Sequence, residues 1–432
     1  MRSLHRPHLL ASFLTKRWGV PVLVTAVGAM LALLCSIPKL RASCSITPKV
    51  TLGIDVLLNE RIDLLQGKRV ALLTHPAGVD GQLVPTLDRV FNDKRVKLTQ
   101  LLSPEHGIRG DLPNGETSPE SIEPVTGLPL EGIYGAHKRP SAAALSRIDA
   151  IVFDVQDVGS RSYTYIATMA EAMKAAKESN LKFIVLDRPN PIGGLKFEGP
   201  IRDEKYQSWI SWGPLPITHG MTVGEVAQFY NEEAGIHCDL TVVKMKGWKR
   251  EMRWEDTGLT WVPPSTGIPN APSALGYAIT ALVGGVSLNV NEGIGTAMPF
   301  LLVGAAFANS VAFAETLNQM NAAGSDGLFY RPYFYTPHYS DFKDQQLQGT
   351  QLLFKDAAKI FPVKQALQIL VSLQKLYGPQ LKVEDMKRFG RMWGNDDVLA
   401  LLQKGKSASE IEATWITDLK KFEEKRKQAL LY

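Results

Sequence analysis

Residues 150–186, AIVFDVQDVGSRSYTYIATMAEAMKAAKESNLKFIVL, contain the pattern that decides the fold. The apolar runs at 150–155 and 182–186 each have the length of a buried strand. Between them, apolar side chains recur at steps of three and four residues, which predicts a helix with one apolar face: Ile166, Met169, Met173 and Ala176. Two buried strands joined by a helix predict a βαβ unit with parallel strands.

The same alternation of strand and helix extends to both sides of this unit. Residues 69–74 (RVALLT) and 96–102 (VKLTQLL) predict two further buried strands. Thr222 and Glu225 form a T-x-x-E capping box, which predicts the start of a helix in MTVGEVAQFYNEEAG, and residues 238–244 then predict an edge strand. The chain is therefore predicted to be an α/β protein with a Rossmann-like, mainly parallel sheet domain over residues 45–270.

The proline-rich segment WVPPSTGIPNAP at 261–272 fits neither a helix nor a central strand, so it predicts a linker or a rigid loop that lines a site. We place a domain boundary there. The remainder mixes glycine-rich loops with helical runs at 364–376 and 411–431. It predicts a smaller α+β ancillary domain over residues 275–432.

The amino-terminal region predicts export from the cytoplasm. Residues 18–37, WGVPVLVTAVGAMLALLCSI, carry no charge over 20 residues, which is long enough for one membrane-spanning helix. The basic leader at 1–17 is expected to stay in the cytoplasm, so the body is expected in the cell envelope, periplasmic or extracellular. The segment is either a membrane anchor or a signal segment that is removed.

Composition narrows the classes of binding partner and the kinds of cross-link or metal site that the chain can have. Apolar residues at 45% and charged residues at 21% are typical of a folded chain, and a net charge of +5 over 432 residues does not predict nucleic-acid binding. Of the three cysteines, Cys35 lies in the apolar segment, and Cys44 and Cys238 are too few for a disulfide framework or a cysteine metal site.

Polar clusters follow the predicted strands, and ligands of open α/β sheets bind beyond the carboxyl ends of the strands. Glu105 and His106 come directly after the strand at 96–102. A carboxyl in that position can hold a proton and donate it to a leaving oxygen, so Glu105 is the first candidate for a general acid. A carboxylate that only caps the next turn is the alternative.

Further candidates fall in the loops after the next two strands. Asp154, Asp157, Arg161, Asp187 and Arg188 could form a carboxylate pair with a carboxylate-binding guanidinium, or an ion-pair network that only ties loops together.

Aromatic and imidazole side chains add to these acids. Tyr163 and Tyr165 offer rings for a sugar to pack on, with one expected to be exposed and one buried. His219 precedes the capped helix and could act as a base or a ligand. Glu292, in a glycine-rich loop, could supply the second carboxylate, or could be a solvated turn residue.

Several catalytic signatures are absent from the chain. It has no GxxxxGK[ST], no HExxH and no strand-linked GxGxxG, which argues against nucleotide and zincin chemistry. It also has no GxSxG elbow, which argues against an α/β-hydrolase esterase.

Five motifs in order, SPEHGIRGD, DVQDVGSRSYTYI, LDRPNPIGG, HGMTVGEVA and NEGIGTAMPF, resemble the NamZ (YbbC-like) exo-β-N-acetylmuramidases. The resemblance covers the chain from about Gly53 to its end. It implies a Rossmann-like domain with a smaller ancillary domain and an active site between them. It also implies release of N-acetylmuramic acid (MurNAc) from the non-reducing ends of peptidoglycan fragments, such as the MurNAc-GlcNAc disaccharide, without a metal or organic cofactor.

Carried over position by position, the resemblance covers a set of acidic, basic and polar side chains: Glu105, His106, Asp154, Gln156, Asp157, Arg161, Tyr163, Asp187, Arg188, Asn190, His219 and Glu225. It makes Glu105 the expected general acid, with Asp154, Asp157 or Glu292 as its partner and His219 as an orienting group or auxiliary base. The lactyl carboxylate of muramic acid would suit Arg161 or Arg188, because a guanidinium pairs with a carboxylate at two points.

The carboxyl-terminal motifs depart from the family pattern. The family reads roughly E-G-T-N-x-S-E-G-R-G-T where residues 286–296 are VSLNVNEGIGT, so Ile294 replaces an arginine. A family P-S-P-N likewise becomes PSTG at 264–267. These changes predict a different sugar in that half of the site. Together with the apolar segment at 18–37, they leave open an inactive module that binds peptidoglycan or a partner. A second alternative is a hydrolase that holds a hard metal cation through oxygen-rich ligands and an imidazole: Asp154, Asp157, Asp187 and His219.

Overall fold

A seven-stranded sheet carries the first half of the chain, as the sequence predicts. The strand order is β3-β4-β2-β1-β5-β6-β7, and every neighbouring pair is parallel except β3 with β4. The strands are β1 (Arg69–Thr74), β2 (Lys97–Ser103), β3 (Ser121–Ile122), β4 (Pro129–Gly132), β5 (Ala150–Asp154), β6 (Lys182–Leu186) and β7 (Asp239–Val243). The predicted strands at 69–74 and 182–186 coincide with β1 and β6, and β7 is an edge strand as expected.

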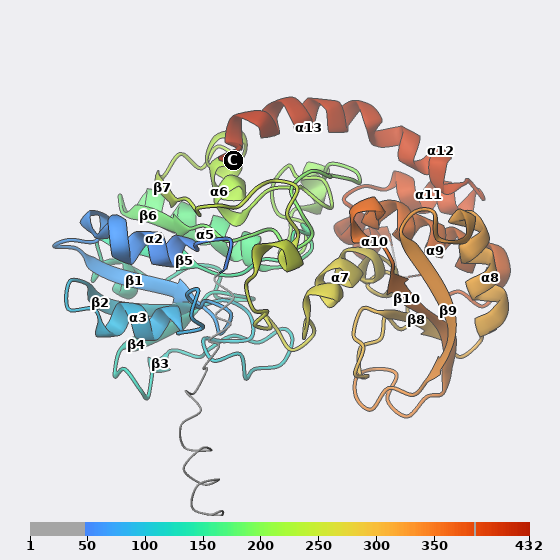
Figure 1. Ribbon diagram of the computed structural model, residues 1–432, viewed down its shortest axis with the longest axis horizontal. Coiled ribbons are helices and arrows are strands. Elements are labelled where there is room, and N and C mark those ends of the chain that lie inside the picture. Colours follow the sequence, from blue (N-terminus) through green and yellow to red (C-terminus); the bar gives the residue numbers. More distant parts are fainter. Residues whose placement is uncertain (1–47, 384–385) are drawn as a thin grey trace, which may run out of the picture. The chain divides into compact units, whose positions relative to one another are not determined.

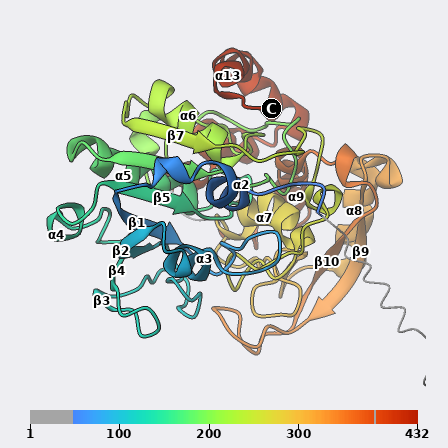
Figure 2. The same cartoon turned by 60° about the vertical axis from the view of Figure 1, so that its left-hand side comes forward.

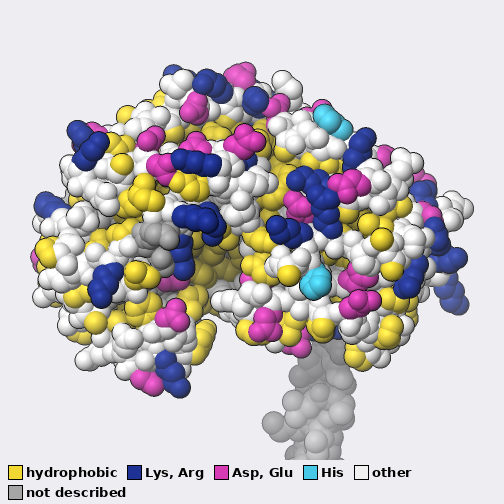
Figure 3. Space-filling view, turned by 180° about the vertical axis from the view of Figure 1, so that it is seen from behind, with side chains coloured by type: hydrophobic (Ala, Val, Ile, Leu, Met, Phe, Trp, Pro, Cys, Tyr) yellow, Lys and Arg dark blue, Asp and Glu magenta, His cyan; other side chains and the backbone are white. Residues whose placement is uncertain are grey.

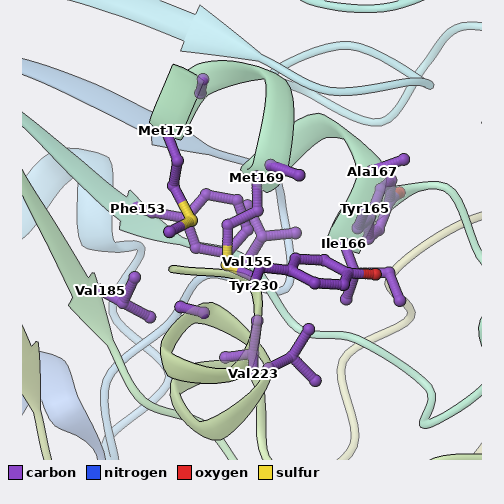
Figure 4. Close-up of a cluster of buried hydrophobic side chains, with 14 of the residues drawn as sticks. Phe153, Val155, Tyr165, Ile166, Ala167, Met169, Met173, Val185, Val223 and Tyr230 are labelled. Carbon is purple, nitrogen blue, oxygen red and sulfur yellow. The ribbon is translucent and has the colours of Figure 1, made fainter. Parts of the chain in front are cut away.

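Helices cover both faces of this sheet, because successive side chains of a strand point to opposite faces. Ile151 and Phe153 of β5 pack with the helices α5 (Tyr165–Glu178) and α6 (Val223–Glu233), in the core drawn in Figure 4. Val152 lies in the core of the other face, which includes α2 (Gly53–Glu60) and α3 (Thr86–Asn92). Burial on both faces explains why the strands read as continuous apolar runs.

Two local predictions in this half are confirmed. The helix predicted from the spacing of Ile166 and Met169 is α5, and it joins β5 to β6 as a βαβ unit. The capping box is present, with the Thr222 hydroxyl accepting from the Glu225 N–H and the Glu225 carboxylate accepting from the Thr222 N–H. A short helix α4 (Ala142–Leu145) precedes β5.

The second half is smaller and mixes helices with an antiparallel sheet. Strands β8 (Leu302–Ala305), β9 (Leu328–Tyr335) and β10 (Leu347–Phe354) lie in the order β8-β10-β9. The helices α7 (Ala271–Gly284), α8 (Ser310–Met320) and α9 (Pro362–Tyr377) pack around them, and both views place α7 between the two sheets (Figures 1 and 2). A Rossmann-like sheet followed by a smaller α+β part is the fold that the sequence predicts.

The carboxyl-terminal segment differs from the single helix predicted at 411–431. After α10 (Met386–Trp393) and α11 (Asp397–Gln403), it divides into α12 (Ala408–Glu412), a 3-10 turn (Ala413–Trp415) and α13 (Ile416–Ala429). The break separates two packing surfaces, because α12 contacts α9 whereas α13 contacts α6 of the first half (Figure 1). The chain therefore ends beside the large sheet.

The computed structural model describes residues 48–383 and 386–432. The predicted leader at 1–17 and apolar segment at 18–37 lie outside these ranges. Within them, no helix combines the length and the apolar character that crossing a bilayer requires. Residues 48–432 form one compact unit, so the division at 270–275 stays a prediction. Acidic and basic side chains are interspersed over the face in Figure 3, where hydrophobic side chains line a central hollow.

Candidate active site

A pocket of about 240 Å³ lies beyond the carboxyl ends of β2 and β5. Its lining combines polar groups from the loops of the large sheet with apolar groups from the second half of the chain. The lining residues are Glu105, His106, Asn114, Tyr134, Ser162, Tyr163, Thr164, Ile210, Ser265, Gly267, Ile268, Tyr277, Ile294 and Phe300. The loop at 261–270 contributes three of them, so it is a site-lining loop rather than a simple linker.

Glu105 is the only acidic side chain among these lining residues. Its Oε2 accepts a hydrogen bond of 2.6 Å from the Thr164 hydroxyl, and its Oε1 accepts one of 2.8 Å from the Gly115 N–H. The phenol of Tyr134 lies beside it, and burial together with this carboxylate raises the phenol's pKa. The carboxyl is half-buried, is oriented by hydrogen bonds at both oxygens and lines the pocket, so its position relative to a bound group is fixed.

His106 also lines the pocket, in an unusual backbone conformation. Its φ of 71° lies in the left-handed region, where a residue with a Cβ is strained. The turn is held by a 2.8 Å hydrogen bond from the His106 N–H to Glu116 O. Nδ1 lies 3.1 Å from Leu112 O, and since a carbonyl only accepts, Nδ1 carries a proton and Nε2 is left for a ligand.

Aromatic rings pack against one another behind these polar groups. Tyr163 makes edge contacts with Tyr165 and Tyr277, at ring-centroid distances of 4.7 and 5.4 Å. Tyr163 donates to Ser265 Oγ at 2.9 Å, and Tyr165 donates to Pro264 O at 2.7 Å. Both phenols are buried, so the expectation of one exposed ring was wrong; the loop at 264–265 covers them.

Asp157 and His219 form a buried pair that does not line the pocket. Burial raises the pKa of Asp157 to about 7 and, together with Arg426, lowers that of His219 to about 3. The Met221 N–H donates to His219 Nδ1, which puts the imidazole proton on Nε2. Nε2 lies 3.9 Å from Asp157 Oδ2, beyond hydrogen-bonding distance, while that oxygen accepts from the Gly159 N–H at 2.7 Å.

Asp154 and Arg188 form the ion pair that was the structural alternative to a binding site. The Nε of Arg188 lies 2.5 Å from Asp154 Oδ1, and its second nitrogen donates to Asp154 Oδ2 and to Val79 O. The Thr86 hydroxyl also donates to this carboxylate. Both side chains are fully buried and outside the pocket lining, so Arg188 is not placed to bind a lactyl carboxylate there.

Asp187 and Asn190 hold loops together at the same edge of the sheet. The Asp187 carboxylate accepts from the Thr222 hydroxyl at 2.9 Å and from the Tyr432 hydroxyl at 2.7 Å, and burial raises its pKa to about 7. The Asn190 amide donates to Met221 O at 2.9 Å. Neither lines the pocket, and both connect β6 to the segment that precedes α6.

Arg161 is fully buried away from the pocket. One terminal nitrogen donates to Pro200 O and Leu215 O at 3.0 and 2.7 Å, and the other donates to Met392 O at 3.2 Å. These carbonyls come from both halves of the chain. Sequence reasoning considered Arg161 for the lactyl carboxylate, but its donors join the two halves instead.

In the loop at 291–296, one side chain packs against α7 and another lines the pocket. Glu292 does not line the pocket. Its carboxylate packs against Gly284 at the end of α7, so closely that a Cβ added to Gly284 would lie 2.0 Å from Oε2. Burial raises the pKa of Glu292 to about 7. Ile294, where the family pattern has an arginine, does line the pocket. Sequence reasoning therefore flagged the right loop, but the side chain in the pocket is Ile294.

The structure does not assemble the alternative metal site. Among residues 48–383 and 386–432, no three His, Cys, Asp or Glu side chains are grouped so that they could hold an ion. Asp154 is bound to Arg188, and Asp187 is bound to Thr222 and Tyr432.

Sequence reasoning missed Thr164, Tyr134 and Tyr277. Tyr134 follows the carboxyl end of β4, next to β2 in the sheet, so its place could have been predicted had this short strand been recognised. It also missed His75, whose Nε2 accepts from the Gln156 N–H at 2.8 Å and whose Nδ1 lies 3.2 Å from Pro264 O. Burial and Arg188 lower its pKa to about 3.

Known proteins resemble the chain over nearly all of the described residues. Residues 70–272 match the family model described as "Exo-beta-N-acetylmuramidase NamZ, N-terminal", and residues 275–432 match the corresponding C-terminal model. The "Peptidoglycan beta-N-acetylmuramidase NamZ" of Bacillus subtilis is 41% identical over 385 residues, which cover 89% of this chain and 92% of that protein.

Two crystal structures of DUF1343 family proteins from Bacteroides fragilis share the fold. One is 35% identical with a TM-score of 0.83, and the other is 28% identical with a TM-score of 0.68. Each match covers 89% of this chain and 99% of the other.

Proposed function

Because the chain belongs to the NamZ family of exo-β-N-acetylmuramidases, we propose that it removes N-acetylmuramic acid residues from the non-reducing ends of peptidoglycan fragments. The observation that carries the proposal is the pocket, which is lined by a single carboxyl, that of Glu105, and by the aromatic rings of Tyr134, Tyr163 and Tyr277. Aromatic rings suit the apolar faces of a sugar, and a held carboxyl suits protonation of a glycosidic oxygen.

The reaction is the addition of water across the bond between the anomeric carbon and the leaving oxygen. Glu105 donates a proton to that oxygen as the bond breaks, and a water molecule adds its hydroxyl to the anomeric carbon. His106 is the basic side chain in the lining, and its Nε2 can take the proton of that water. The carboxylates of Asp154, Asp157 and Glu292 lie outside the lining, so we give them no direct role in this step.

Several motif residues lie outside the pocket, and we propose that they hold the loops that form it. Asp157 fixes the turn at 157–159, which leads to the pocket residue Ser162, through the Gly159 N–H. His75 connects the end of β1 to the loop at 264 that covers Tyr163 and Tyr165. We propose that these contacts fix the positions of the pocket residues, so that a sugar binds in one orientation.

The experiment that tests the function compares two disaccharides of opposite order. The full-length protein is incubated with MurNAc-GlcNAc and with GlcNAc-MurNAc, and free sugars are measured over time. We expect release of MurNAc from the first and no cleavage of the second. Cleavage of the second alone would replace the activity by that of a glucosaminidase, and tight binding without cleavage of either would favour a binding module.

We also propose that residues 18–37 bring the enzyme to the cell envelope, where peptidoglycan lies. The support is the uncharged run of 20 residues preceded by a basic leader. Cell fractionation of the full-length chain and of a chain that begins at residue 45 tests this: the full-length chain should be exported, and the shortened chain should remain in the cytoplasm.

A further inference from the structure

The contact between Thr164 and Glu105 is a short hydrogen bond inside the pocket. The Thr164 hydroxyl donates to Glu105 Oε2 at 2.6 Å, which is shorter than the 2.8 Å bond from the Gly115 N–H to Oε1. Thr164 is 8% exposed and lines the pocket together with Glu105. A buried hydrogen bond competes little with water, and a bond that ends on an ionised group is stronger than a neutral one. The Thr164 hydroxyl is therefore placed to act on the charge of Glu105.

Thr164 stands at the start of α5, a position where threonine usually caps the helix. Here it does not, because its φ of −68° and ψ of −14° are already helical and its hydroxyl accepts no N–H of α5. The hydroxyl is directed at Glu105 instead. A helix start also favours a nearby negative charge, because the first N–H groups of a helix have no partner within it. The start of α5 therefore stabilises the charge of Glu105, and the Thr164 side chain contributes little to the helix itself.

Three phenols fix the main chain on both sides of Thr164. The neighbours Tyr163 and Tyr165 each donate a hydrogen bond to the proline-rich loop that lines the pocket, at 2.9 and 2.7 Å. Tyr277 of α7 donates to Ser162 O at 3.0 Å. These bonds hold the segment that carries Thr164, so its hydroxyl keeps its direction when the charge of Glu105 changes.

We propose that Thr164 is a positioning residue of the muramidase reaction: its hydroxyl stabilises the Glu105 carboxylate that forms when the proton passes to the leaving oxygen. The inference rests on the proposed function and adds a residue to the same site. In this step the O–H bond of Glu105 breaks and an O–H bond forms on the leaving oxygen, while Thr164 keeps its own proton. The bond from Thr164 strengthens as the negative charge grows, so it stabilises the transition state more than the bound substrate.

The test compares two variants of the full-length protein: Thr164→Val keeps the branched shape and removes the hydroxyl, whereas Thr164→Ser keeps the hydroxyl. We expect Thr164→Val to lower kcat on MurNAc-GlcNAc by about 10- to 100-fold with little change in KM, because the lost bond ends on a charged group. Thr164→Ser should keep most of the wild-type kcat. An aryl glycoside of MurNAc, whose leaving group departs with little protonation, should lose about threefold or less in Thr164→Val. Equal losses on the two substrates, or an unchanged kcat, would overturn the inference.

Stability separates this role from a structural one. Since the Thr164 hydroxyl caps no N–H of α5, Thr164→Val should unfold at nearly the same urea concentration as the wild type. Ser407→Ala is the matched control, because the Ser407 hydroxyl does cap its helix, α12, by accepting from the Glu410 N–H. This control should unfold more readily and keep the wild-type ratio of aryl to natural activity.

Two further outcomes are kept distinct. If Thr164→Val does not fold, Thr164→Ala removes the same hydroxyl with a smaller side chain, and the same ratio of aryl to natural activity decides. A loss in Thr164→Ser as large as that in Thr164→Val would assign the effect to packing and reject the inference. Failure of the wild-type protein to release MurNAc from MurNAc-GlcNAc would reject the proposed function instead.

Discussion

Glu105 and Asp154 lie at the carboxyl ends of β2 and β5, the two strands that flank β1, yet their surroundings are opposite. Glu105 is half-buried, faces a pocket and has no cation partner among the lining residues. Asp154 is fully buried, paired with Arg188 and bonded to Thr86. The comparison shows that a carboxyl at the end of a strand can either line a pocket or form a buried ion pair that stabilises the fold. What distinguishes the two is whether the carboxyl has free space beside it.

The most direct way to break this comparison is Glu105→Gln. Glutamine keeps the shape but cannot donate the proton, so turnover of MurNAc-GlcNAc should fall by about 10²–10⁴. An aryl glycoside with a good leaving group should lose less, and the ratio of aryl to natural activity should rise. Initial rates on both substrates measure this. Glu116→Gln, an exposed position in the following loop, is the matched control and should keep the wild-type ratio. Equal losses on both substrates would mean that Glu105 is not the acid.

On the buried side of the comparison, Arg188→Met should affect stability rather than the chemical step. It leaves Asp154 as an unpaired charge in the core, and removal of one partner of a buried ion pair costs about 3–5 kcal/mol. Urea unfolding followed by tryptophan fluorescence measures the loss. Arg95→Met, which removes an exposed pair with Asp93, should change little. If Arg188→Met instead raised KM without loss of stability, Arg188 would be a substrate-binding residue after all.

The same contrast explains how far the sequence could predict this protein. Apolar runs and helical spacing were enough to predict β1, β6 and α5, because elements that are buried in the two cores of the sheet need apolar side chains at the buried positions. Glu105, Asp154 and Asp187 also lie at or just after the carboxyl ends of β2, β5 and β6. Periodicity could not show that Arg161 binds carbonyls of both halves, because Met392 is 231 positions away. Nor could it separate Ile294, in the pocket, from Glu292, two residues earlier and packed on α7.

Asp157 gives an effect that depends on pH, and this effect tests whether Asp157 is a buried acid that stays protonated in the folded protein. Burial raises its pKa from an ordinary value near 4 to about 7, so between these pH values the folded state holds a proton that the unfolded chain has released. Its contribution to stability is therefore fully present below about pH 4 and is lost as the pH rises toward 7. Each bound proton corresponds to a slope of about 1.4 kcal/mol per pH unit.

Asp157→Asn removes this proton from the balance, because an amide does not titrate, while its oxygen can still accept from the Gly159 N–H. The free energy of unfolding of the variant should therefore rise relative to the wild type between pH 4 and 7, by up to about 1.4 kcal/mol per pH unit. His219 and His75 titrate in the opposite sense in this range, since burial lowers their pKa values, but they are present in both proteins and cancel in the difference. Urea unfolding at a series of pH values measures it, with the exposed Asp239→Asn as control. A difference that does not change with pH would mean that Asp157 is charged in the folded protein despite its burial.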